Sequence, residues 1–161
     1  MAETQAVAGT RAADADLPAP DLSIVVTLYN EADSLEELYR RTLSALEPGP
    51  RTFELIFVDD GSTDGTFAAL ERLHMGDPRV RAVRFKRNFG QHPAMHAGLS
   101  RARGDIVVTM DGDLQNAPED IPRLVEAVEA GNEVASGRRS ISTTKPIAPR
   151  SATGDHTNRP R

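Results

Sequence analysis

The hydrophobic positions along the chain follow two alternating patterns. Four short runs of apolar and β-branched residues have the length of a strand, namely Leu22–Leu28, Phe53–Val58, Val80–Phe85 and Asp105–Met110. Four longer segments place apolar residues near helical spacing, namely residues 34–46, 66–74, 93–103 and 119–130. The sequence therefore predicts four strands, each followed by a helix.

Residues at the predicted helix ends agree with this assignment. Asp33 or Ser34 can cap the first helix, and Asp64 can cap the second. Gly131 follows the last helix, where a left-handed residue is expected. An alternation of strands and helices predicts an α/β fold in which helices cover both faces of a parallel sheet. Such sheets bind ligands at the carboxyl ends of their strands, which is where we look for function.

Acidic side chains concentrate directly after the second and fourth predicted strands. They are Asp59, Asp60, Asp64, Asp111 and Asp113. Ionised carboxylates at close range repel one another, and a divalent cation removes that repulsion. Asp111 and Asp113 can direct oxygens at one ion, because Gly112 between them allows a sharp turn. An isolated Asp-Gly-Asp is also typical of an ordinary solvated turn, so the residues alone leave both interpretations open.

The composition of the chain excludes several kinds of chemistry and of cellular site. The 161 residues, 39% of them hydrophobic and 27% charged, are enough for one domain. The absence of cysteine excludes disulfides, a thiolate nucleophile and a cysteine zinc site. No segment approaches the ~20 apolar residues of a membrane span, and no signal peptide pattern is present at the N-terminus.

Charge is unevenly distributed along the chain. The net charge of −5 predicts no nucleic-acid partner. Residues 1–137 have 13 basic and 23 acidic side chains, net −10, whereas residues 138–161 have six basic and one acidic, net +5. The proline-containing polar segment 140–161 predicts a disordered basic tail, and residues 1–20 predict a flexible leader. The folded domain is expected over residues 21–139.

Four motifs occur in order along that domain. They are Val25–Glu31 (VVTLYNE), Val58–Thr66 (VDDGSTDGT), Arg87–His92 (RNFGQH) and Asp111–Asn116 (DGDLQN). Together they resemble family 2 glycosyltransferases of the GT-A fold, and most of all the polyprenyl-phosphate glycosyltransferases, a group that includes dolichol-phosphate mannose synthase and undecaprenyl-phosphate sugar transferases. The resemblance covers about residues 22–139. It implies a Rossmann-like, mostly parallel GT-A sheet that binds a nucleotide sugar and is incomplete at its C-terminal side.

The resemblance also implies site residues. Those expected to bind the nucleotide sugar are Thr27, Leu28, Tyr29, Glu31, Asp59, Asp60, Lys86, Arg87, Gln91, Asp111, Gly112 and Asp113. Asp111 and Asp113 are the expected catalytic residues, and with Gln115 they are the expected ligands of Mg²⁺ or Mn²⁺.

Several of these residues have a second interpretation. Tyr29 and Glu31 match residues that line the pocket for base and ribose, although Tyr29 could instead pack and Glu31 could be a charge near a helix start. Asp60 is the better acceptor for the base, whereas Asp59 could hold a loop.

The third motif adds positive charge beside the acidic edge. Lys86 and Arg87 could pair with a diphosphate or with neighbouring carboxylates. His92 precedes a proline at a helix start, which favours a capping or surface histidine over a metal ligand.

The implied reaction is inverting transfer of a sugar from a UDP- or GDP-linked donor to a polyprenyl phosphate. An ionised acceptor phosphate needs no strong base, so no general base is named. Members of this group act at the cytoplasmic face of the membrane, and a cytoplasmic location is expected here.

The chain departs from the family after Gly137, where an acceptor-binding segment is expected and a polar tail follows. We expect a chain truncated after its donor-binding half, as a frameshift, a premature end or a degraded gene would produce. Arg138 and Arg139 would then either face an acceptor phosphate or begin the tail. Donor binding should then persist while lipid-phosphate glycosylation is weak or absent. Two other classes stay open: a non-catalytic nucleotide-sugar-binding module, and a GT-A transferase for a soluble hydroxyl acceptor or a nucleotidyltransferase.

Overall fold

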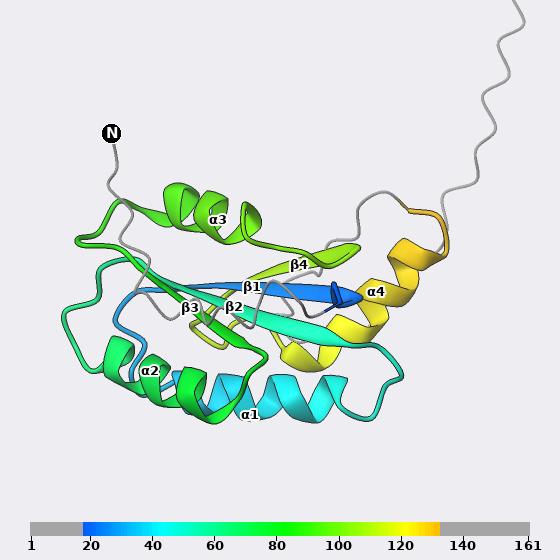
Figure 1. Cartoon of the computed structure of the whole chain (residues 1–161), viewed down its shortest axis with the longest axis horizontal. Coiled ribbons are helices and arrows are strands. Elements are labelled where there is room, and N and C mark those ends of the chain that lie inside the picture. Colours follow the sequence, from blue (N-terminus) through cyan, green and yellow to red (C-terminus); the bar gives the residue numbers. More distant parts are fainter. Residues whose placement is uncertain (1–17, 133–161) are drawn as a thin grey trace, which may run out of the picture.

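The computed structural model describes residues 18–132 (Figure 1). Its elements are β1 (Leu22–Leu28), α1 (Leu35–Leu46), β2 (Phe53–Asp59), α2 (Thr66–Gly76), β3 (Val80–Arg84), α3 (Gln91–Leu99), β4 (Ile106–Asp111), the 3₁₀ turn η1 (Pro118–Asp120) and α4 (Ile121–Glu129). Most of the predicted leader, all of the predicted tail, and Arg138 and Arg139 lie outside the described residues. The predicted order of strands and helices is confirmed.

The four strands form one parallel sheet in the order β3-β2-β1-β4. Each of β1's pairings, with β2 and with β4, is parallel, as is the pairing of β2 with β3. The chain runs outward from β1 to β3 and then crosses back to place β4 on the other side of β1. Such a reversal is the position at which parallel sheets bind ligands, because the loops after β1 and β4 diverge there.

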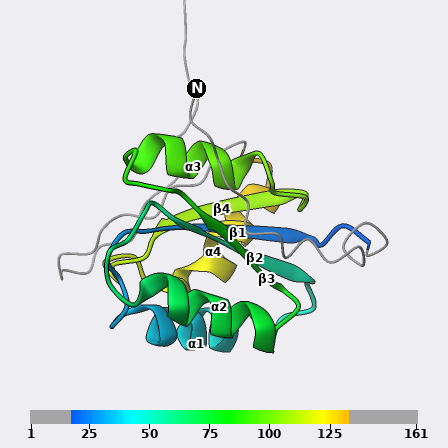
Figure 2. The ribbon, with the colours of Figure 1, turned by 60° about the vertical axis from the view of Figure 1, so that its left-hand side comes forward.

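Helices cover both faces of the sheet, as predicted. Helices α1, α2 and α4 lie on one face and α3 lies on the other (Figures 1 and 2). Alternate residues of β1 separate into the two cores: Ile24 packs toward α1 and α2, and Val25 packs toward α3. All seven residues of β1 are buried, which is the pattern of a central strand covered on both faces.

Helix α3 begins two residues earlier and ends four residues earlier than predicted. Pro93 lies in its first turn, where the missing N–H of proline costs no helical hydrogen bond. The helix packs closely against the sheet at Gly98. A Cβ added there would lie 2.3 Å from Cγ1 of Val25, so there is no room for a side chain. After Leu99 the amides of Arg101 and Ala102 donate to the carbonyls of Gly98 and Leu99, three residues back. The chain therefore continues in turns and the helix ends.

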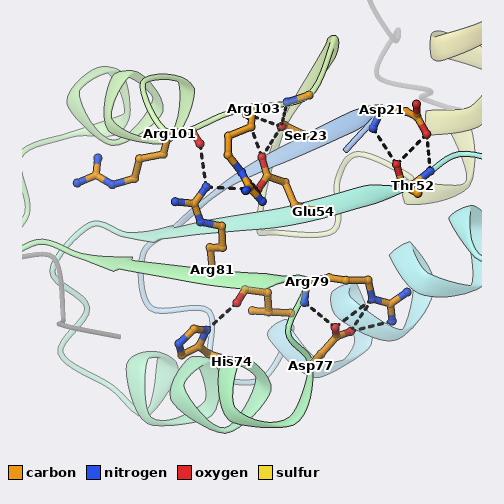
Figure 3. A network of polar contacts seen from close by, with 12 residues as sticks. Asp21, Ser23, Thr52, Glu54, His74, Asp77, Arg79, Arg81, Arg101 and Arg103 are labelled. Carbon is orange, nitrogen blue, oxygen red and sulfur yellow. Dashed lines mark hydrogen bonds and ion pairs between the residues drawn. The ribbon is translucent and has the colours of Figure 1, made fainter. Parts of the chain in front are cut away.

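A buried polar cluster lies at the amino end of the strands (Figure 3). The carboxylate of Glu54, 2% exposed, accepts hydrogen bonds from the Ser23 hydroxyl (2.7 Å) and the Arg103 backbone amide (3.0 Å). Its other oxygen pairs with the guanidinium groups of Arg81 (3.3 Å) and Arg103 (3.0 Å). Burial opposes ionisation, but the bonds from Ser23 and Arg103 outweigh it and lower the pKa of Glu54. The cluster joins β1, β2 and β3 to the segment between α3 and β4.

Candidate functional site

The loops that follow the four strands meet at the opposite edge of the sheet. In the strand register Thr27 is the partner of Asp111, and Leu28 is the partner of Asp59. The ends of β1, β2 and β4 are therefore adjacent, which places Asp59 and Asp111 at the same edge of the sheet.

Asp111 is the last residue of β4 and is half-buried. Its Oδ1 accepts a hydrogen bond from Nε2 of Gln91 (2.5 Å), the first residue of α3, and lies 3.3 Å from the Thr27 hydroxyl. Elements far apart in sequence thus meet at one carboxylate.

The turn after Asp111 is packed against the end of β1. The Gly112 amide donates to the Thr27 carbonyl at 3.0 Å, and a Cβ on Gly112 would be 2.3 Å from Cδ2 of Leu28. Asp113 follows, and its Oδ1 accepts a hydrogen bond from the Gln115 amide at 3.0 Å. The turn therefore has no room for a side chain at its glycine and presents the two aspartates on either side of it.

Ser34 joins the first loop to this turn. It occupies the N-cap position of α1 as predicted, but its side chain makes no capping bond. Its hydroxyl lies 2.5 Å from Oε2 of Glu31 and 3.1 Å from the Gly112 carbonyl. The sequence does not predict this role of Ser34, for which the one local signal is its three-residue spacing from Glu31.

The two aspartates at the end of β2, Asp59 in the strand and Asp60 after it, both hold loops. Oδ1 of Asp59 accepts the Ser62 amide at 3.0 Å, so the interpretation of Asp59 as a loop-holding residue is confirmed. The two oxygens of Asp60 accept the backbone amides of Phe89 and Gly90, both at 2.8 Å. The sequence did not predict this second attachment, which fixes the segment between β3 and α3 to the end of β2.

Asp64 supports the start of α2. Its Oδ1 accepts the amide of Thr66 at 2.9 Å and the Thr66 hydroxyl at 2.5 Å, and these bonds lower the pKa of Asp64. Its Oδ2 accepts the Ala32 amide at 3.2 Å. The predicted cap position is wrong by one residue, because Gly65 is the N-cap of α2, but Asp64 does accept the first amide of the helix.

Tyr29 and Arg87 are exposed near this edge. The Tyr29 residue is 46% exposed, so it does not pack in the core and its ring is available to a ligand. The guanidinium of Arg87 lies 4.3 Å from the centre of the Phe89 ring, a cation–π contact that orients it. Lys86 is exposed in the same loop.

The oxygen atoms of this turn are of the kind that a hard divalent cation prefers. Within residues 18–132 no three histidine, aspartate or glutamate side chains group to form a metal site. Asp111 and Asp113 provide two carboxylates, and Gln115 can add an amide oxygen. Mg²⁺ is commonly held by one or two carboxylates together with substrate phosphates, which is the set available here.

The sequence profile described as "Glycosyl transferase family 2" matches residues 23–158. The chain belongs to glycosyltransferase family 2. The suspected family is therefore confirmed, and the parallel sheet with helices on both faces is the GT-A fold that the family implied.

Two relatives are named undecaprenyl-phosphate 4-deoxy-4-formamido-L-arabinose transferase. The protein of Edwardsiella ictaluri (strain 93-146) is 47% identical over 114 residues, which are 70% of this chain and 35% of the relative. That of Pseudomonas syringae pv. syringae (strain B728a) is 47% identical over 124 residues, 76% of this chain and 37% of the relative. The chain thus spans about a third of the length of these relatives.

A solved structure shares the fold. The crystal structure of S. aureus TarS 1-349 in complex with UDP aligns with a TM-score of 0.53 and 25% sequence identity. The alignment covers 66% of this chain and 32% of that chain.

Among the helices within residues 18–132, none is both long and apolar enough to cross a membrane.

Proposed function

We propose that this chain binds a nucleoside-diphosphate sugar with Mg²⁺ or Mn²⁺, and that the whole enzyme transfers the sugar to a polyprenyl phosphate. The observation that supports this most is the meeting of Asp111, Asp113 and the exposed Tyr29 at the switch point of a family 2 sheet. The acceptor class rests on the names of the two relatives. The UDP complex of TarS supports a nucleotide as the ligand of this edge.

The base and ribose are proposed to bind between the loops after β1 and β2. Tyr29 offers an exposed ring to cover the base, and Glu31 offers a carboxylate for hydroxyl or N–H donors. Asp60 is the proposed acceptor for the base. Each of its oxygens already accepts one amide, and a carboxylate oxygen has a second lone pair for another donor.

The diphosphate is proposed to bind beside the turn after β4. Asp111, Asp113 and Gln115 would hold the cation, and Lys86 and Arg87 would pair with phosphate oxygens. When bound, the cation neutralises the charge that develops on the departing nucleoside diphosphate. Thr27, Leu28 and Gly112, which are further expected contacts, pack together beside Asp111 and Asp113. Asp59 and Gln91 complete the expected set; Asp59 holds the loop after β2 and Gln91 donates to Asp111.

The proposed transfer is an inverting displacement. An oxygen of the acceptor phosphate forms a bond to C1 of the sugar from the face opposite the leaving group. The bond between C1 and the diphosphate oxygen breaks, and its electron pair leaves with the nucleoside diphosphate. The acceptor is already ionised at neutral pH, so no residue is required to remove a proton.

The test is nucleotide binding with and without metal. UDP, GDP and their sugar conjugates are titrated into the chain by calorimetry, in Mg²⁺ or Mn²⁺ and again in EDTA. The double variant Asp111→Asn/Asp113→Asn should lose the metal-dependent part of the affinity. The matched control is Asp105→Asn/Asp120→Asn, which changes two exposed aspartates, one just before β4 and one in η1. Equal metal dependence in both double variants would remove the metal site from this proposal.

This chain spans about a third of the relatives' length, so the two parts of the proposal are tested on different proteins. Donor binding is tested on this chain, whereas sugar transfer to undecaprenyl phosphate is tested on a protein of the relatives' full length. We expect this chain alone to show weak or no transfer. Rapid transfer by the chain alone would contradict that expectation and leave donor binding intact.

A further inference from the structure

The segment from Lys86 to Gly90, here called the β3–α3 loop, is fixed to the end of β2 at two places. Asp60 accepts the amides of Phe89 and Gly90 at 2.8 Å each. Gly61, with φ +71°, lies directly against the loop, since a Cβ there would be 2.2 Å from the backbone carbon of Arg87. Asp60 is 4% exposed, so both bonds form away from competing water.

The attached loop determines where α3 begins. Gly90 has φ +98° and ψ 163°, a conformation that L-residues with a side chain rarely adopt. The next residue, Gln91, is the first of the helix, and its amide reaches Oδ1 of Asp111 at 2.5 Å. The backbone position of Gln91 is thus set by contacts that begin at Asp60, and its exposed side chain reaches Asp111 from there.

A second donor reaches the same oxygen. The Thr27 hydroxyl, on the central strand β1, lies 3.3 Å from Oδ1 of Asp111. Gln91 approaches from the helix that covers the sheet, and Thr27 approaches from the strand beside β4. Two donors on different elements restrict the rotation of the carboxylate more than either does alone.

We propose that Gln91 is a positioning residue, which orients the Asp111 carboxylate toward the metal and diphosphate rather than binding the nucleotide itself. This inference rests on the proposed function. It also connects the two ends of the proposed site, because Asp60 at the base end holds the loop that places Gln91 at the metal end. Donors that orient a ligating carboxylate typically contribute a factor of about 10–100 to metal affinity.

The experiment compares Gln91→Met with His96→Met in the complete chain. Methionine keeps the length of Gln91 but donates no hydrogen bond, and His96 is an exposed residue of the same helix. Three quantities are measured: the Kd of Mn²⁺ at saturating UDP or GDP, the Kd of the nucleotide in EDTA, and the midpoint of thermal unfolding. For Gln91→Met we expect the Mn²⁺ affinity to fall about 10-fold or more, while the other two quantities match those of His96→Met.

Thr27→Val provides an independent variant. It removes the other donor to Oδ1 and keeps the shape of the side chain. Because that donor is at 3.3 Å rather than 2.5 Å, we expect a smaller loss of Mn²⁺ affinity. If Gln91→Met fails to fold, Gln91→Leu replaces it in the same comparison, because leucine also donates no hydrogen bond.

The outcomes separate this inference from the proposed function. A wild-type chain without metal-dependent nucleotide binding overturns both. Wild-type binding that Gln91→Met retains in full overturns the positioning role alone. A loss of nucleotide affinity in EDTA would show that Gln91 contacts the nucleotide directly, which also overturns it.

Discussion

Replacing Glu54 by glutamine should destabilise the fold strongly while leaving the proposed site intact. The substitution keeps the size of the side chain and removes the charge that faces Arg81 and Arg103. Glutamine also has an amide group in place of one accepting oxygen. At least one of the donors around Glu54, namely Ser23, the Arg103 amide or a guanidinium, then loses its partner.

The magnitude follows from burial. Breaking a buried ion pair by removing one partner typically costs about 3–5 kcal/mol. The side chains of Arg81 and Arg103 are 25% and 32% exposed, so each guanidinium can turn toward water when the Glu54 charge is removed. We therefore expect the lower end of that range, about 3 kcal/mol, in the free energy of unfolding.

The assay is urea unfolding followed by circular dichroism, with Glu37→Gln as the control. Glu37 forms an exposed ion pair with Arg40 on α1, with side chains 45% and 64% exposed, and such pairs contribute about 1 kcal/mol or less. Nucleotide binding by the folded fraction should be the same in both variants, because Glu54 lies at the other end of the sheet. The reasoning is refuted if Glu54→Gln is no more destabilising than Glu37→Gln.

Three further predictions concern pH and the turns of the candidate site. The folded-state pKa of Glu54 is lowered, so the ionised carboxylate stabilises the fold fully above its unfolded pKa near 4.5. That stabilisation is lost as the pH falls through the folded-state pKa. In an acid titration, the free energy of unfolding of Glu54→Gln should therefore fall less steeply below pH 4.5 than that of the wild type. Gly112→Ala should cost about 1–3 kcal/mol in a urea melt, because its Cβ overlaps Leu28, and an unchanged midpoint would contradict the packing. Gly61→Ala should displace the β3–α3 loop, which solvent exchange of the Phe89 and Gly90 amides would report as faster than in wild type.

The hydrophobic pattern by itself determined the order of the elements. Strand β1 is apolar except for Ser23 and Thr27 because both of its faces are covered, and such a run is readable without coordinates. The predicted start of α3 at Pro93 is wrong, because the first helical turn tolerates a proline and the helix begins at Gln91.

Sequence also identified the acidic edge and the Asp-Gly-Asp turn, since strand ends in a parallel sheet must gather at one side. It could not show that Gln91 and Thr27 donate to Asp111, or that Asp60 holds the β3–α3 loop. Those contacts join residues 20 to 84 positions apart. Such pairings depend on strand order and on the crossing from β3 back to β4, which local propensity does not specify. The sequence therefore determined which acidic residues lie at this edge of the sheet, whereas the tertiary structure decided how their carboxylates are oriented.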